Sequence, residues 1–176
     1  HLSHEILMQM RKSIYIPVLM MAAMLSACHS SKEKMFDKGQ ENLEASLDYP
    51  KQLKLIAHTE PDSAFGVNYF TRKEITGMLK VMDVVTKKLM KSTTGINDIT
   101  KADAYTVNLM RRQMNAANEV QTMIFKNVPK GDWSGWKVKI DYECVDKDGI
   151  KYRAERWIFF DREGENIIKT FEIPLP

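Results

Sequence analysis

The chain has 176 residues, of which 26 are Lys or Arg and 23 are Asp or Glu, and its formal net charge is +3. Because the two signs nearly cancel, the composition argues against nucleic acid and other polyanions as partners. The two cysteines, Cys28 and Cys144, are too few for a disulfide framework, so packing must hold the folded part together.

The first informative segment ends at Cys28. Arg11 and Lys12 form a positively charged end, residues 13–24 form an apolar run, and small residues follow. The run is shorter than the roughly 20 apolar residues that a membrane-spanning helix needs. Its end, Leu25-Ser26-Ala27-Cys28, resembles the lipobox of bacterial lipoproteins. That resemblance implies export, cleavage before Cys28 and lipid on the Cys28 thiol. It places the protein in the cell envelope, anchored to a bacterial membrane and facing the periplasm or the cell surface.

An ordinary signal peptide, or a buried helix with an incidental cysteine, would also have such a segment. The lipobox interpretation divides the chain into four parts. Residues 1–9 are upstream or appended sequence, because Met10 directly precedes the charged pair. Residues 10–27 are the signal peptide, residues 28–34 a tether, and residues 35–176 a single domain.

The start of the domain predicts a helix followed by a β-hairpin. The helix is expected over residues 34–47, and Pro50 ends it because the residue before a proline avoids helical angles. Alternating apolar and polar residues then predict strands over residues 53–58 and 65–70. Residues 60–63 between them have the composition of a turn, so we expect the two strands to pair.

Two amphipathic helices are predicted next. Thr71 and Glu74 form a capping-box pattern at the start of the first helix, which residues 93–95 end. The second helix is expected to begin at Thr100 with Asp103 and to stop before Pro129, and the short link predicts an antiparallel pair. The residues expected to face the core are Ile75, Met78, Leu79, Met82, Val85 and Leu89, then Val107, Met110, Met114, Ala117, Val120 and Ile124.

From Trp136 the apolar residues recur at every second position, which predicts a meander of strands. A three-residue loop over residues 147–149 would put Gly149 in the left-handed conformation and pair Trp136 with Phe160. A loop of two or four residues would instead turn charged side chains toward the apolar face, so we favour the three-residue loop.

The last strand is predicted over residues 167–173, with Ile167, Phe171 and Ile173 on the same apolar face as Trp136. The expected fold class is therefore α+β, with an antiparallel sheet (a hairpin plus a three-strand meander) packed against helices. This order of elements resembles the NTF2-like and cystatin-like folds, in which a curved sheet wraps around helices. The resemblance implies a cone-shaped arrangement with a pocket between sheet and helices, and no specific chemistry.

Arg156 is the first candidate site residue. The favoured register puts it on the core face opposite Ile140, where a guanidinium needs a partner because an unpaired buried charge is unfavourable. Arg156 could hold a carboxylate or phosphate ligand in a cleft. It could equally pair with an acidic residue of a helix or extend past the sheet edge. In an enzyme, Arg156 would act with Tyr142 or Tyr152.

Aromatic residues are the second set of candidates. Trp157 and Phe159 fall on the opposite, more polar face of the sheet, where they would form a partner surface if exposed. The alternative is that the first helix or the loop around Trp133 covers them. Trp133 and Trp136 mark a further candidate contact loop, residues 132–136.

Several other groups are weaker candidates. His58, Glu60 and Asp62 cluster at the first turn, but too few further ligands accompany them to predict a metal site. Cys144 is expected to be an inert buried thiol. The helix lysines are expected to be solvated rather than lipid-bound, and the helix methionines to fill the core rather than a groove: Lys73, Lys80, Lys87 and Lys91, then Met78, Met82, Met110 and Met114.

The sequence as a whole predicts a non-catalytic domain that binds an envelope protein or a small ligand. We expect no cofactor, no nucleic-acid partner, and a membrane contact through lipidated Cys28. Two alternatives are an inhibitor or immunity-type protein that blocks an envelope hydrolase through residues 132–136, and a small enzyme with an NTF2-like pocket. The sequence contains no glycine-rich phosphate loop and no metal-spaced Cys/His set, which argues against the enzyme.

Overall fold

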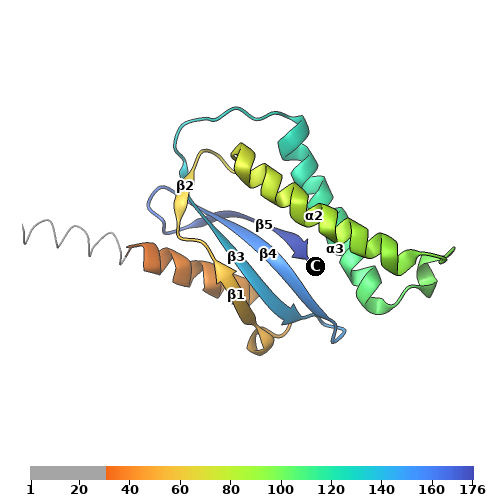
Figure 1. The fold of residues 1–176 in the computed structure, drawn as a ribbon. Coiled ribbons are helices and arrows are strands. Elements are labelled where there is room, and N and C mark those ends of the chain that lie inside the picture. The colour runs from red at the N-terminus through yellow and green to blue at the C-terminus, as the bar shows by residue number, and fades with distance from the viewer. Residues whose placement is uncertain (1–30) are drawn as a thin grey trace, which may run out of the picture.

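A computed structural model describes residues 31–176 of the chain (Figure 1). The predicted signal peptide and Cys28 lie outside the described residues. The elements in order are a helix over residues 31–46, a 3-10 turn (Pro50–Gln52), β1 (Lys54–His58), β2 (Asp62–Ala64), α2 (Arg72–Thr93), a 3-10 turn (Ile99–Lys101), α3 (Ala104–Phe125), β3 (Gly135–Val145), β4 (Lys151–Phe160) and β5 (Ile167–Leu175). This content confirms the α+β class. The first helix already includes residues 31–34, which were predicted as tether.

The sheet is antiparallel, with strand order β1-β3-β4-β5 and with β2 also paired to β3. The predicted hairpin is therefore wrong, because β1 and β2 do not pair with each other. Both lie along the same side of β3, one after the other, and residues 65–70 form no strand. The 11-residue β3 is long enough to pair with both. Pro61 lies between them and has no N–H to donate, so the ladder is interrupted there.

The β3–β4 hairpin has the predicted register. Trp136 pairs with Phe160, Ile140 with Arg156, and Gly149 has a φ of +78° in the three-residue loop. β5 differs from the prediction, because the pairing shifts by one residue where Ile168 is inserted opposite Phe159 and Phe160. A one-residue insertion exchanges the two faces of a strand. Ile167 therefore stays on the predicted face, whereas Phe171 and Ile173 lie on the other.

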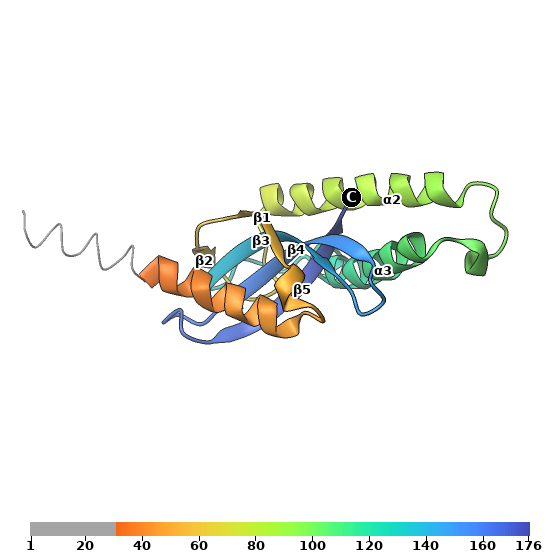
Figure 2. The same ribbon diagram turned by 90° about the horizontal axis from the view of Figure 1, so that it is seen from below.

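Helices cover both faces of the sheet (Figure 2). The helix over residues 31–46 packs on the face that carries Val138, Ile140 and Ile158, through Met35 and Leu43. α2 and α3 pack on the opposite face and beside β5, which builds a second core. A sheet with two covered faces has no wholly polar face, so alternation along its strands does not tell solvent from core. Among the described helices, none combines the length and apolar character of a membrane span.

The ends of α2 and α3 lie close to the predicted residues, but the buried faces of the two helices differ from the predicted ones. Thr71 and Glu74 form the predicted capping box. α3 begins later than predicted, since Asp103 rather than Thr100 is its N-cap and accepts from the backbone N–H of Thr106. The face of α3 is also rotated: Val107 and Met114 are exposed, and the buried residues are Thr106, Asn108, Leu109, Ala116, Val120 and Met123. On α2, predicted core residue Leu79 is exposed.

Candidate binding groove between α3 and β5

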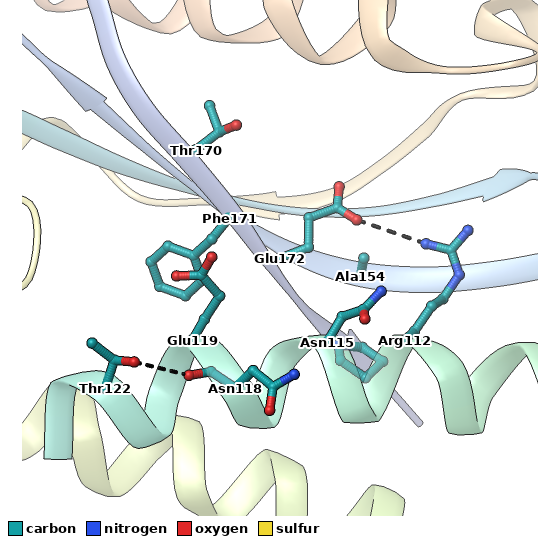
Figure 3. A pocket seen from close by; sticks show the side chains of 10 residues that line it. Arg112, Asn115, Asn118, Glu119, Thr122, Ala154, Thr170, Phe171 and Glu172 are labelled. Atoms are coloured by element: carbon teal, nitrogen blue, oxygen red, sulfur yellow. Dashed lines mark hydrogen bonds and ion pairs between the residues drawn. The ribbon is translucent and has the colours of Figure 1, made fainter. Parts of the chain in front are cut away.

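A groove of about 530 Å³ runs between α3 and the edge strand β5 (Figure 3). One wall is a polar face of α3, and the other is β5 with the neighbouring Ala154 of β4. The lining residues are Arg112, Asn115, Asn118, Glu119, Thr122, Ala154, Thr170, Phe171, Glu172 and Pro174. Amides, hydroxyls and charged groups dominate this lining, so the groove suits a polar occupant.

The strand wall of the groove is an unpaired edge. β5 is the last strand of the sheet, and no backbone hydrogen bond joins it to any described segment other than β4. An edge strand with free N–H and C=O groups is a template for another strand unless something covers it. α3 lies beside this edge, and the groove separates part of α3 from β5.

Arg112 is held in place on the helix wall. Its Nε donates to Asn108 Oδ1 at 2.8 Å, and its guanidinium lies 3.6 Å from the centre of the Tyr152 ring. Arg112 Nη1 is also 3.7 Å from Glu172 Oε2, the ion pair drawn in Figure 3. A guanidinium fixed by a hydrogen bond, a ring and a carboxylate loses little further freedom when a ligand binds it.

Glu172, which also lines the groove, is the centre of a largely buried polar network. Its carboxylate accepts from Arg156 Nε at 2.6 Å and from the Tyr142 hydroxyl. Arg156 also donates through Nη1 to Ser46 Oγ at 2.6 Å, which joins the first helix to the sheet. Burial, and then the negative charge of Glu172, raise the pKa of Tyr142 far above its ordinary value. Tyr142 therefore stays a proton donor to Glu172 throughout the physiological range.

Arg156 lies where the sequence predicted, and its partner is an acid of the neighbouring strand rather than of a helix. Glu172 pairs directly opposite it across β4 and β5. Glu172 was not predicted because the alternation along β5 indicated the wrong face, and the correct register would have identified the pair. Arg156, Tyr142 and Tyr152 do come together, with Arg112 as an unpredicted fourth member. Arg156 itself does not line the groove.

Two side-chain amides of α3 that line the groove have no partner among the described residues. The side chains of Asn115 and Asn118 make no hydrogen bond to any described residue, and both residues are exposed along the groove. Thr122 donates to the backbone carbonyl of Asn118 at 3.2 Å (Figure 3). Glu119 pairs with Lys169 at 3.4 Å. No signal in the sequence distinguished these residues, because polar residues on one side of an amphipathic helix are the ordinary case.

Trp157 and Phe159 do not form an exposed partner surface. They are 7% and 1% exposed and lie under α2 and α3, not under the first helix or the Trp133 loop. Phe70, just before α2, packs edge-on against both rings, with centroids 5.2 and 5.8 Å away. The expected polar face is a second core because the α2–α3 pair covers it.

Trp133 and Trp136 meet at one end of the sheet. Their rings pack edge-to-face at 5.8 Å, and Trp133 is 38% exposed. Arg162 donates to the Trp133 carbonyl at 3.2 Å, and Trp136 Nε1 donates to the Arg162 carbonyl. Ser134 ties the loop to β2 through the Ala64 carbonyl. This loop is thus braced at three points and presents one partly exposed indole.

The remaining candidates lie apart from the groove. The His58 ring packs on Phe36, and residues 31–176 contain no group of three potential metal ligands. Cys144 is buried, with its Sγ 3.4 Å from the Tyr49 carbonyl. Met78 is buried, whereas Met114 is 63% exposed and fills no core. The α2 lysines are exposed, with Lys87 paired to Asp83 at 2.7 Å: Lys73, Lys80, Lys87 and Lys91.

Comparison of the chain with protein-family models, with curated proteins and with solved structures finds no match. The lipobox and the NTF2-like or cystatin-like resemblance thus stay predictions.

Proposed function

We propose that this protein is a lipid-anchored component of the bacterial cell envelope whose domain binds an extended peptide segment of an envelope partner. The anchor would be Cys28, after cleavage of the signal peptide over residues 10–27. Several acyl chains on one residue give a lasting membrane attachment, whereas one chain alone binds marginally.

The α3–β5 groove is the observation that carries the binding role. A peptide that adds to an edge strand gains main-chain hydrogen bonds, and neighbouring side chains then select its sequence. The free outer side of β5 supplies the first requirement. Asn115 and Asn118 supply amides that can both donate to and accept from a peptide backbone, and Arg112 supplies a fixed cation.

Metabolic labelling tests the anchor. Cells fed an alkyne fatty acid should label the native protein, and Cys28→Ser should abolish the label. Cys144→Ser is the matched control and should keep the label. An unlabelled native protein, or a label that survives Cys28→Ser, would contradict the anchor.

Selection from a random peptide library on the purified protein tests the groove. Selected peptides should slow amide hydrogen exchange in β5, because strand addition uses its free N–H groups. They should bind Asn115→Ala/Asn118→Ala at least tenfold more weakly, and the Arg111→Ala control, on the same helix but outside the groove lining, about equally. Peptides that leave exchange in β5 unchanged would contradict this role.

A further inference from the structure

A second groove, of about 690 Å³, lies between α2 and the sheet, beside β3 and β4 and the segment that joins β1 to β2. Gly77, Met78 and Val81 of α2 form one wall, and Trp157 with the charged residues of β3 and β4 forms the other. The connection from β1 to β2, residues 59–61, closes one side together with Asp62, the first residue of β2. This groove shares no residue with the α3–β5 groove, so a ligand bound in it is independent of the peptide proposal.

Gly77 has no local structural reason to be glycine. It lies inside α2, where glycine is among the poorest helix formers. A Cβ added to Gly77 would meet nothing within 4 Å, so close packing does not require glycine either. Gly39 of the first helix is the contrast, because its Cβ would lie 3.3 Å from Ile158 Cδ1. The absence of a side chain at Gly77 therefore widens the groove and stabilises nothing in the described fold.

The opposite wall offers a buried donor that lacks an acceptor. Trp157 is 7% exposed, and its Nε1 has no hydrogen bond to any described residue. The Glu155 carboxyl lies near the indole, and the indole N–H opposes the rise that burial causes in the pKa of this carboxyl. The two groups do not have the geometry of a hydrogen bond, so Trp157 Nε1 stays without an acceptor among the described residues. A buried N–H without an acceptor costs free energy, and an acceptor that arrives in the groove would recover it. Lys139 pairs with Trp157 across β3 and β4 and supplies a second donor at the same place.

The groove lining carries charges of both signs: Lys73, Lys137 and Lys139, and Glu60, Asp62, Glu74 and Glu155. Glu74 is already neutralised by Lys137, whose Nζ lies 2.8 Å away. Burial raises the pKa of the Glu155 carboxyl, with Lys139 opposing. Lys139 Nζ is 3.8 Å from Glu155, longer than a hydrogen bond, and can turn toward a new anion. Met78 and Val81 add an apolar surface beyond these groups.

We propose that the groove between α2 and the sheet binds an amphiphilic monocarboxylate, with its carboxylate on Lys139 Nζ and Trp157 Nε1 and its apolar chain along Gly77, Met78 and Val81. The apolar side fits a hydrocarbon chain, and the two neighbouring donors fit the two oxygens of one carboxylate. A fatty acid of medium length has this chemistry.

Titration of the purified protein with decanoate tests the proposal by NMR. The chain has three tryptophans and hence three indole N–H signals, and Trp157→Phe assigns one of them. Decanoate should shift the Trp157 signal downfield in a saturable way and leave the signals of Trp133 and Trp136 unchanged. Decanol and decylamine should bind at least tenfold more weakly than decanoate.

Two variants make the test specific. Gly77→Leu fills the groove from the helix side and should weaken decanoate at least tenfold, whereas the matched Gly77→Ala should weaken it less than threefold. Lys139→Met should weaken decanoate at least tenfold and leave decanol unchanged. Any of the following results would overturn the proposal. The Trp157 signal shows no saturable shift, decanol binds as tightly as decanoate, or decylamine binds more tightly. Equally, Gly77→Leu or Lys139→Met binds decanoate as tightly as the native protein does.

Discussion

Arg156 of β4 and Glu172 of β5 face each other across the two strands, and Arg156 Nε donates to Glu172 Oε1 at 2.6 Å. The pair is largely buried, with side chains 11% and 23% exposed. The same carboxylate accepts from Tyr142 and lies 3.7 Å from Arg112. One acid therefore connects the first helix, the sheet and α3, because Arg156 also reaches Ser46 and Arg112 belongs to α3.

Loss of this carboxylate should be strongly destabilising. Glu172→Ala leaves the Arg156 charge and the Tyr142 hydroxyl without their acceptor, and removal of one partner of a buried pair costs about 3 kcal/mol. Urea denaturation of the variant and of the native protein measures the difference. Asp83→Ala, which removes the exposed pair with Lys87, is the control and should cost under about 0.5 kcal/mol. A loss below about 1 kcal/mol for Glu172→Ala would contradict the central role of this residue.

The two helix glycines should respond in opposite ways to the same change. Gly77→Leu enters open space and gains helix propensity, so stability should rise by about 0.5–1 kcal/mol. Gly39→Leu pushes against Ile158 and Phe160 in a packed core and should cost about 1–3 kcal/mol. Thermal and urea unfolding of both variants check the comparison. A destabilised Gly77→Leu would show that α2 lies closer to the sheet than described.

Two glycines of the β3–β4 hairpin, Gly135 at its start and Gly149 in its loop, should differ in how strongly an added side chain destabilises the protein. Gly135 has a φ of +145°, and its Cβ would lie 2.1 Å from the Phe160 carbonyl oxygen. Gly149 has a φ of +78° and open space around it. Gly149→Asn should therefore cost under about 1 kcal/mol, since asparagine tolerates this conformation. Gly135→Ala should lower the free energy of unfolding clearly more than Gly149→Asn does. If urea unfolding shows the larger loss for Gly149→Asn, the described conformation at the start of β3 is wrong.

Glu155 should make the protein less stable as the pH rises. Burial raises its pKa above the ordinary value of 4.5, with Lys139 opposing and Asp141 adding to the increase. Between pH 4.5 and the raised pKa, the folded state binds more protons than the unfolded state, so the stability that Glu155 contributes falls as the pH rises. This loss of stability is complete once the pH exceeds both pKa values. Glu155→Gln removes the effect. Its free energy of unfolding, relative to the native protein, should therefore increase from about pH 4 to about pH 7, and a difference that stays constant would contradict the buried, unfavourable carboxylate.

Local patterns predicted the local structure well. Thr71 and Glu74 identified the start of α2, because a capping box needs only residues within one turn. Gly149 and the alternation on each side identified the β3–β4 register, because a one-residue error would have buried charges. Arg156 was placed opposite Ile140 by the same argument, although its partner Glu172 was not found.

Contacts between distant segments explain the errors. Asp62–Ala64 pairs with β3 rather than with β1, and neither segment carries a signal for a strand so far along the chain. The insertion of Ile168 turns Phe171 and Ile173 toward the second core. The sequence of β5 does not indicate this insertion, because the strand is short and has few polar residues that would mark its faces. Trp157 and Phe159 look like surface aromatics only until α2 and α3 are placed over them.

The sequence by itself determined the helices, the three strands of the meander, the N-terminal cap of α2, the hairpin loop and the α+β class, since each depends on residues close together in the chain. Only the tertiary structure decided which faces are covered and where the two grooves lie. Arg112, Glu172, Asn115 and Asn118 come from α3 and β5, and Gly77 and Trp157 from α2 and β4, so each groove exists only after helices pack on the sheet. Packing sums many weak, long-range contacts, which no short sequence window contains.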